Sequence, residues 1–169
     1  MRTFLLDTCI WSYWFDAERY PQKNANIRKQ LQKLTPDSIL GISIITWGEV
    51  AYGHKLESPE ETAIQSKYIQ FITSKGPKTF DIDIHTANAY GELRSLLFDK
   101  YVPADKRKKN LRPEQLVDPV TSKELGIQEN DIWIAAQAMA RNLVLVTNDK
   151  LAHIREVAGD KLHIKNWAT

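Results

Sequence analysis

Short apolar runs alternate along the chain with segments in which apolar residues recur every three or four positions. The apolar runs occupy residues 3–6, 39–45 and 143–146. Runs without polar alternation are typical of parallel strands covered on both faces. Helical spacing is found in residues 10–15, 24–34, 60–73, 86–98, 130–140 and 151–157, and residues 162–164 form a last short apolar run. The pattern predicts an α/β fold with a mostly parallel central sheet and helices on both faces.

Acidic residues follow the ends of the predicted strands. Asp7 comes directly after the first strand, Glu49 lies in the helix after the second, and Asp149 lies three residues beyond residues 143–146. In open α/β sheets ligands bind outside the carboxyl ends of the strands, so these acids are candidates for a site. A fourth acid, Asp131, opens the helix before the strand at residues 143–146, although periodicity alone does not bring it to this edge.

Crowded carboxylates raise one another's pKa unless a cation neutralises them. Oxygen ligands of this kind hold Mg²⁺ or Mn²⁺, often together with waters and substrate phosphate. Such sites activate water and stabilise the leaving oxygen in phosphodiester cleavage. The acids therefore indicate a metal site for phosphate chemistry.

Each acid also has a purely structural explanation, which for Asp149 is an Asn-Asp turn after the strand. Asp7 and Asp131 stand where helix caps and first-turn acids are common, and Asn130 can cap the helix that contains Asp131. Thr46 and Glu49 have the spacing of a capping box. The pattern alone leaves capping and function open.

Composition narrows the class of protein. With 169 residues, 43% of them hydrophobic and 26% charged, the chain is expected to form one domain over residues 1–169. The net charge of +2 decides little about partners. The single cysteine, Cys9, excludes an intrachain disulfide and is compatible with a reducing cytoplasm; it is expected to be a small buried hydrophobe rather than a nucleophile. No apolar run approaches the roughly 20 residues that span a bilayer, so no membrane contact is expected.

The least regular part is residues 99–126, which contain three prolines and the basic run at residues 106–109. This segment is expected to be a surface insertion. The basic run is compatible with a solvated loop or with contacts to phosphates.

Residues 80–84 superficially match the Asp-x-Asp loop of haloacid-dehalogenase-like phosphatases through Asp81 and Asp83. That loop normally ends the first strand, which here ends at Asp7. Alternation of apolar residues with solvated acids explains this segment more simply.

Four segments resemble, in order, the four signatures of PIN-domain ribonucleases, and they are most similar to the VapC toxins of bacterial and archaeal type II toxin–antitoxin pairs. The segments are FLLDT at residues 4–8, ITWGEVAYG at 45–53, NDIWIAA at 130–136 and LVTND at 145–149. The resemblance extends to AYGELR at residues 89–94 and LHIKNW at 162–167, and so covers nearly the whole chain.

The resemblance implies a three-layer α/β/α fold and an endoribonuclease in which four acids converge on Mg²⁺ or Mn²⁺. The implied ligands are Asp7, Glu49, Asp131 and Asp149, with Thr8, Thr147 and Asn148 as neighbours that orient them. Many relatives carry Asn at the position of Asp149 or place the acid later, which makes this ligand the least secure. The implied partners are an RNA substrate, a cognate antitoxin and a second copy of the chain, in the cytoplasm. The competing hypothesis is a non-catalytic PIN-like scaffold that binds RNA or a protein.

Overall fold

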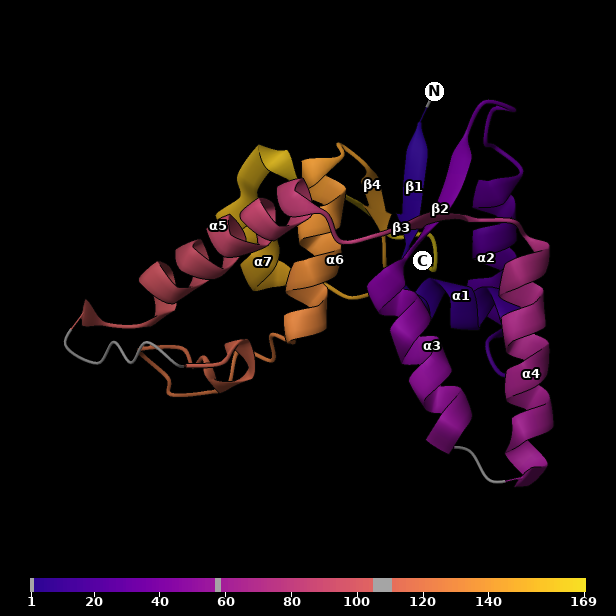
Figure 1. Ribbon diagram of the computed structural model, residues 1–169, viewed down its shortest axis with the longest axis horizontal. Helices are drawn as coiled ribbons and strands as arrows, with labels where there is room; N and C mark the ends of the chain where they lie inside the picture. Colours follow the sequence, from indigo (N-terminus) through magenta and orange to yellow (C-terminus); the bar gives the residue numbers. More distant parts are fainter. Residues whose placement is uncertain (1, 57–58, 105–110) are drawn as a thin grey trace. The chain divides into compact units, whose positions relative to one another are not determined.

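The computed structural model describes residues 2–56, 59–104 and 111–169, which contain five strands and seven α-helices (Figure 1). The chain divides into two compact units. The first unit comprises Met1–Asp81, Leu143–Asp149 and Ile164–Thr169, and the second comprises Ile82–Asn142 and Lys150–His163.

The first unit carries the sheet. Its elements are β1 (Thr3–Leu6), α1 (Thr8–Phe15), α2 (Pro21–Leu31), β2 (Ile39–Ser43), α3 (Ile44–Leu56), α4 (Pro59–Ser74), β3 (Lys78–Phe80), β4 (Val144–Val146) and nearly all of β5 (His163–Lys165). The strand order is β3-β2-β1-β4-β5, and β1 pairs in parallel with both β2 and β4. Leu6 lies opposite Ile42 on one side and Val146 on the other, so the three strands end together.

The central strand is buried on both faces, as its unbroken apolar run predicts. Phe4 and Leu6 pack into one cluster with Trp11 of α1 and Ile27 of α2. Leu5 lies between them on the opposite face and is also fully buried. Because β1 is fixed on both faces, the residue that follows it starts from a rigid position.

The second unit is helical. It contains α5 (Ile84–Tyr101), the 3₁₀ turn η2 (Pro113–Gln115), α6 (Glu129–Ala140), α7 (Ala152–Ala158) and the 3₁₀ turn η3 (Gly159–Lys161). Helix α5 packs against α6 and α7 (Figure 1). Within the described ranges, no helix combines the length and the apolar character that crossing a membrane requires.

Two helix starts differ from the prediction. Strand β2 ends at Ser43, and α3 begins at Ile44 with the Ser43 hydroxyl accepting a hydrogen bond from the Ile45 amide. Thr46 is therefore buried inside the first turn, and the predicted capping box with Glu49 is wrong. Helix α6 begins at Glu129 with Gln128 as its N-cap residue, so the predicted cap at Asn130 is wrong as well. The apolar run at residues 39–45 continues past the end of β2 into α3, whereas the first apolar residue of α6, Ile132, comes three residues after the helix begins.

The predicted insertion has more regular structure than its prolines suggest. Residues 99–101 belong to the last turn of α5, and the later part contains η2 and one antiparallel bridge between Val117 and Glu124. The basic run at residues 106–109 lies outside the described residues.

The alternation predicted over residues 80–84 is wrong, because β3 ends at Phe80 and both Ile82 and Ile84 are exposed. Asp83 instead caps α5, accepting hydrogen bonds from the amide and hydroxyl of Thr86 at 2.8 Å, and it pairs with Arg141 at 3.0 Å. These contacts give Asp83 a structural role at the start of α5.

Candidate metal centre

Asp7 is a buried carboxylate at the carboxyl end of the central strand. It directly follows β1 and is 8% exposed. Its Oδ1 accepts a hydrogen bond from the Thr8 amide at 2.8 Å, which caps α1. Its Oδ2 accepts a hydrogen bond from the Thr147 hydroxyl at 2.8 Å. Capping thus uses one oxygen and leaves the other directed toward the end of β4.

The environment of Asp7 opposes its negative charge. Burial raises the pKa of this carboxyl above its ordinary value, and the charges of Glu49 and Asp149 raise it further, whereas the hydrogen bonds from Thr147 and Thr8 lower it. No lysine, arginine or histidine of the described segments forms a salt bridge with it. A bound cation would supply the missing positive charge.

Thr147 connects Asp7 to the second acid of the cluster. The side chain is 1% exposed, and its hydroxyl accepts a hydrogen bond from the Asp149 amide at 3.0 Å while it donates to Asp7. The ligand atoms of Asp7, Cys9 and Asp149 all lie within 4.8 Å of one another. Asp149 itself is exposed, so the cluster has one buried acid and one open to solvent.

Cys9 is the neighbour that the sequence reasoning missed. Burial and then the charge of Asp7 raise the pKa of its thiol to about 12, which agrees with the prediction of an unreactive cysteine. Its sulfur, however, lies 3.8 Å from Asp7 Oδ2 and accepts a hydrogen bond from the Asn148 amide at 3.4 Å. The sequence could have indicated this neighbour, because Cys9 comes two residues after Asp7, in the first turn of a helix that starts at the sheet edge.

Glu49, in α3, is not one of the three residues of the cluster but lies next to it. Its Oε2 accepts a short hydrogen bond from the Thr8 hydroxyl, and its charge contributes to the raised pKa of Asp7. Thr8 therefore contacts two acids, Asp7 through its amide and Glu49 through its hydroxyl. Asn148 contributes its amide to Cys9, while its side-chain oxygen accepts a hydrogen bond from Asn166 at 3.3 Å.

Asp131 lies in the second unit, in the first turn of α6, where the helix dipole favours a negative charge. The start of this helix is fixed by its neighbour Glu129. Tyr90 donates a hydrogen bond to Glu129 at 2.5 Å, Arg94 donates to the Tyr90 hydroxyl at 2.6 Å, and the Tyr90 and Trp133 rings stack with centroids 3.8 Å apart. The convergence of Asp131 with the acids of the first unit stays a prediction.

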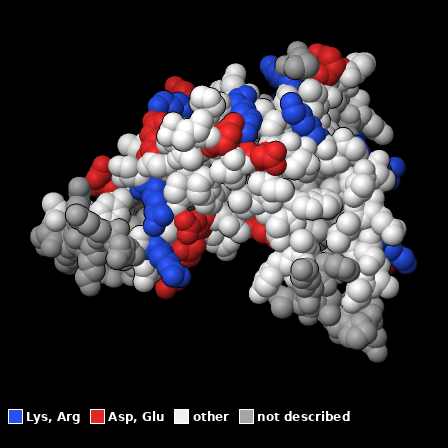
Figure 2. Space-filling model, viewed as in Figure 1, with Lys and Arg blue, Asp and Glu red and all other residues white. Residues whose placement is uncertain are grey.

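The surface charge is mixed. Figure 2 shows basic and acidic side chains interspersed on the face that it draws. With a net charge of +2, the chain has no excess charge that would by itself attract a nucleic acid over a wide area. Recognition of a charged ligand therefore depends on local sites.

Known proteins are similar to this chain over most of its length. The model of the PIN domain family matches residues 4–159. Among solved structures, VapBC2 from Rickettsia felis bound to a DNA fragment from its promoter is 25% identical, with a TM-score of 0.66 and 98% of both chains covered. VapBC-1 from nontypeable Haemophilus influenzae is 22% identical, with a TM-score of 0.69 and 99% of both chains covered. DNA-bound VapBC from Salmonella typhimurium is 23% identical, with a TM-score of 0.67 and 99% of both chains covered. No curated protein matches the chain significantly.

The parallel sheet and these matches confirm the predicted α/β/α fold class and the predicted likeness to VapC toxins.

Proposed function

Because this chain belongs to the PIN-domain family, we propose that it is the toxin of a toxin–antitoxin pair and a metal-dependent endoribonuclease that cleaves RNA phosphodiester bonds. The observation that carries the proposal is the cluster of Asp7, Cys9 and Asp149 at the carboxyl ends of β1 and β4. A parallel sheet with acids at this edge is a common place for ligand binding and chemistry.

The donor set fits a hard divalent cation. Asp7 and Asp149 offer carboxylate oxygens within 4.8 Å of each other, and Glu49 is held beside them by Thr8. Burial and the charges of Glu49 and Asp149 raise the pKa of Asp7, and a cation beside it would favour the ionised form. Mg²⁺ or Mn²⁺ is the proposed ion, since both prefer oxygen ligands. When bound, such an ion lowers the pKa of water and stabilises charge on a phosphodiester.

The chain's own side chains would orient this site. Thr147 fixes Asp7 Oδ2 and the backbone that carries Asp149, because its hydroxyl bonds to both. Thr8 fixes Glu49 relative to the start of α1. Because Asp7 is buried and Asp149 is exposed, the open side of the cluster is the side from which a phosphate would enter. Asp131 is proposed as the fourth ligand on the resemblance of residues 130–136 to the third family signature.

The test is cleavage of RNA by the purified chain in EDTA and after addition of Mg²⁺ or Mn²⁺. Asp7→Asn and Asp131→Asn should each lower the rate at least about a hundredfold, because a metal site supplies several kcal/mol of transition-state stabilisation. Asp160→Asn, which changes an exposed carboxylate in η3, is the matched control and should leave the rate unchanged. Cleavage that survives Asp7→Asn would exclude the proposed site.

The non-catalytic alternative gives a different result in the same experiment. A PIN-like scaffold would bind RNA or a protein without metal-dependent cleavage, and it would tolerate all three Asp→Asn changes. RNA that stays intact with either metal, in a preparation that binds it, would support this alternative.

The proposed partners are an antitoxin and a second copy of the chain, in the cytoplasm. The structures from Rickettsia felis and Salmonella typhimurium are VapBC assemblies bound to DNA, which supports an antitoxin that also binds DNA. Co-expression with the proposed antitoxin should relieve growth inhibition by this chain and yield a stable complex. Light scattering of the purified chain would give its oligomeric state, and a monomer would contradict the proposed homodimer.

A further inference from the structure

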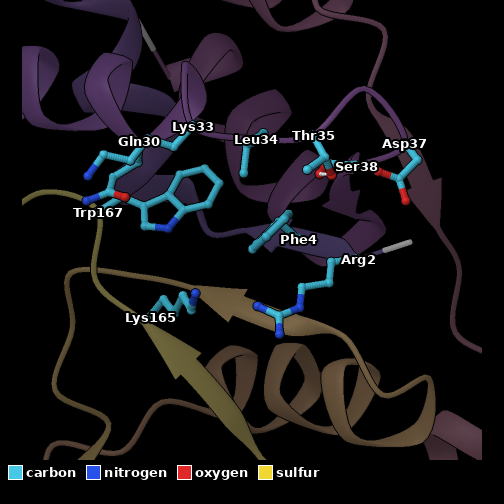
Figure 3. A pocket seen from close by; sticks show the side chains of 10 residues that line it. All are labelled: Arg2, Phe4, Gln30, Lys33, Leu34, Thr35, Asp37, Ser38, Lys165 and Trp167. Carbon is cyan, nitrogen blue, oxygen red and sulfur yellow. Dashed lines mark hydrogen bonds between the residues drawn. The ribbon is translucent and has the colours of Figure 1, made fainter.

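The first unit contains a cavity of about 530 Å³ that we call the basic hollow (Figure 3). It lies between the end of α2 with the loop after it, the start of β1 and the end of β5. Its charged and aromatic lining residues are Arg2, Phe4, Lys33, Asp37, Lys165 and Trp167. The volume falls in the range of about 300–1,000 Å³ that is usual for small-ligand sites.

The hollow has an excess of positive charge. Three cations, Arg2, Lys33 and Lys165, line it against one carboxylate, Asp37, which leaves a net charge of +2. Within the described ranges of the chain, none of the three cations forms a salt bridge. Figure 3 shows the side chains of Arg2 and Lys165 extending toward each other beneath Phe4. Like charges that converge on one space repel each other unless an anion lies between them.

The remaining lining adds an apolar wall and hydroxyl groups. The Phe4 and Trp167 rings pack with centroids 5.1 Å apart and, with Leu34, form the apolar part. The hydroxyls of Thr35 and Ser38 lie 3.1 Å from each other at the loop. Only 4% of Phe4 and 3% of Trp167 is exposed, so the apolar part offers a ligand little surface and the charged side chains select what binds.

We propose that the basic hollow binds the phosphate monoester group of a nucleotide. A phosphate monoester carries a charge of about −1.5 to −2 at neutral pH, which matches the net +2 of the lining, whereas a carboxylate or an internal phosphodiester carries only −1. Arginine and lysine are the side chains that bind phosphate groups best. The same group occurs on a free nucleotide and on the phosphorylated end of an RNA.

One backbone hydrogen bond links the hollow to the candidate metal centre. The carbonyl oxygen of Lys165, which lines the hollow, accepts a hydrogen bond from the Thr147 amide at 3.0 Å. The hydroxyl of the same threonine donates a hydrogen bond to Asp7. An RNA end bound in the hollow would therefore lie in the same unit as Asp7 and Asp149. The binding itself does not rest on the proposed nuclease function.

The test is calorimetric titration of the full chain at low ionic strength in EDTA, which prevents phosphate from binding through a metal at the acidic cluster. Adenosine 5′-monophosphate should bind, and adenosine should bind at least about tenfold more weakly because it lacks the charged group. Lys33→Ala with Lys165→Ala should weaken monophosphate binding at least about tenfold. The control pair, Lys29→Ala with Lys78→Ala, removes the same charge from residues outside the hollow and should have no such effect.

A hexaribonucleotide with a 5′-phosphate, compared with its 5′-hydroxyl form, shows whether the bound phosphate belongs to a free nucleotide or to the end of an RNA. Tighter binding of the phosphorylated RNA than of the mononucleotide would assign the hollow to an RNA end, and equal or weaker binding would assign it to a free nucleotide. Equal binding of adenosine and its monophosphate, no binding of either, or equal losses in the hollow and control pairs would overturn the proposal. RNA cleavage plays no part in these readouts, so the nuclease proposal can fail without affecting them.

Discussion

At the scale of single residues, Thr147 is the side chain that touches both Asp7 and the backbone of Asp149. Thr147→Val keeps the shape of the side chain and removes the hydroxyl that bonds to both. We expect the affinity for Mn²⁺, measured by calorimetry, to fall about 10- to 100-fold, as is typical when a group that orients a ligand is lost. Thr73→Val, at an exposed helix position, should leave the affinity unchanged. Equal affinities in both variants would remove Thr147 from the site.

Ionisation of the buried Asp7 carboxyl should lower the stability of the folded chain by an amount that depends on pH. Its pKa in the folded chain is raised above the ordinary value of 3.8, so the folded state holds the proton more tightly than the unfolded chain. The resulting stabilisation is present below pH 3.8 and is lost as the pH rises through the folded pKa. Asp7→Asn should therefore be more stable than the wild type in EDTA at pH 7.5, and the difference should narrow as the pH falls toward 3.8.

The thermal midpoint measures this difference, since each kcal/mol shifts it by about 2–4 °C in a chain of this size. Asp160→Asn should show neither the gain nor its dependence on pH. A midpoint of Asp7→Asn below that of the wild type at pH 7.5 would contradict the assigned cost of burying the charge.

Cys9 should resist modification in the folded chain. With a pKa of about 12 in place of 9.0, its thiol is almost entirely protonated at pH 8. Alkylation by iodoacetamide, followed by mass spectrometry, should be on the order of a hundredfold or more slower than in urea, because the thiolate is the nucleophile. Equal rates in buffer and in urea would show that the sulfur is accessible and ionised.

At the scale of elements, the β2 and β3 strands approach each other closely at Gly41. A Cβ at this position would clash with the Phe80 ring and lie 3.4 Å from the Lys78 carbonyl oxygen, whereas a Cβ on Gly48 of α3 would meet nothing within 4 Å. Gly41→Ala should lower the free energy of unfolding by about 1–3 kcal/mol through overpacking. Gly48→Ala should raise it by up to about 1 kcal/mol, since alanine favours a helix.

Urea denaturation measures both effects, and their opposite signs make each variant the control for the other. A loss of stability in Gly48→Ala equal to that in Gly41→Ala would indicate a general cost of adding a methyl group.

The elements also show how far the sequence could predict the site. Asp7 and Asp149 could be brought together in advance, because both follow apolar runs and parallel strands end at one edge. The contact between Glu49 and Thr8 could not, since it depends on the angle at which α3 leaves β2. The false capping box at Thr46 has the same origin, because hydrophobic spacing does not locate the first backbone hydrogen bond of a helix.

At the scale of the whole molecule, a bound cation should stabilise the chain by mass action. Mn²⁺ at about one hundred times its dissociation constant adds about 2.7 kcal/mol, or roughly 5–10 °C in the thermal midpoint. Asp7→Asn should abolish this shift and Asp160→Asn should retain it. Asp131→Asn tests the fourth predicted ligand by the same readout, and a full shift in this variant would remove it from the ligand set.

Both borders of the sheet consist of strands of three residues, β3 and β5, and each contains a lysine, Lys78 and Lys165. Unpaired strand edges are templates on which another chain can add a strand and begin aggregation, and short, charged edges oppose this. The chain therefore has little edge on which amyloid-like stacking could start, and a partner that binds it gains more from contacts with side chains than from extending the sheet.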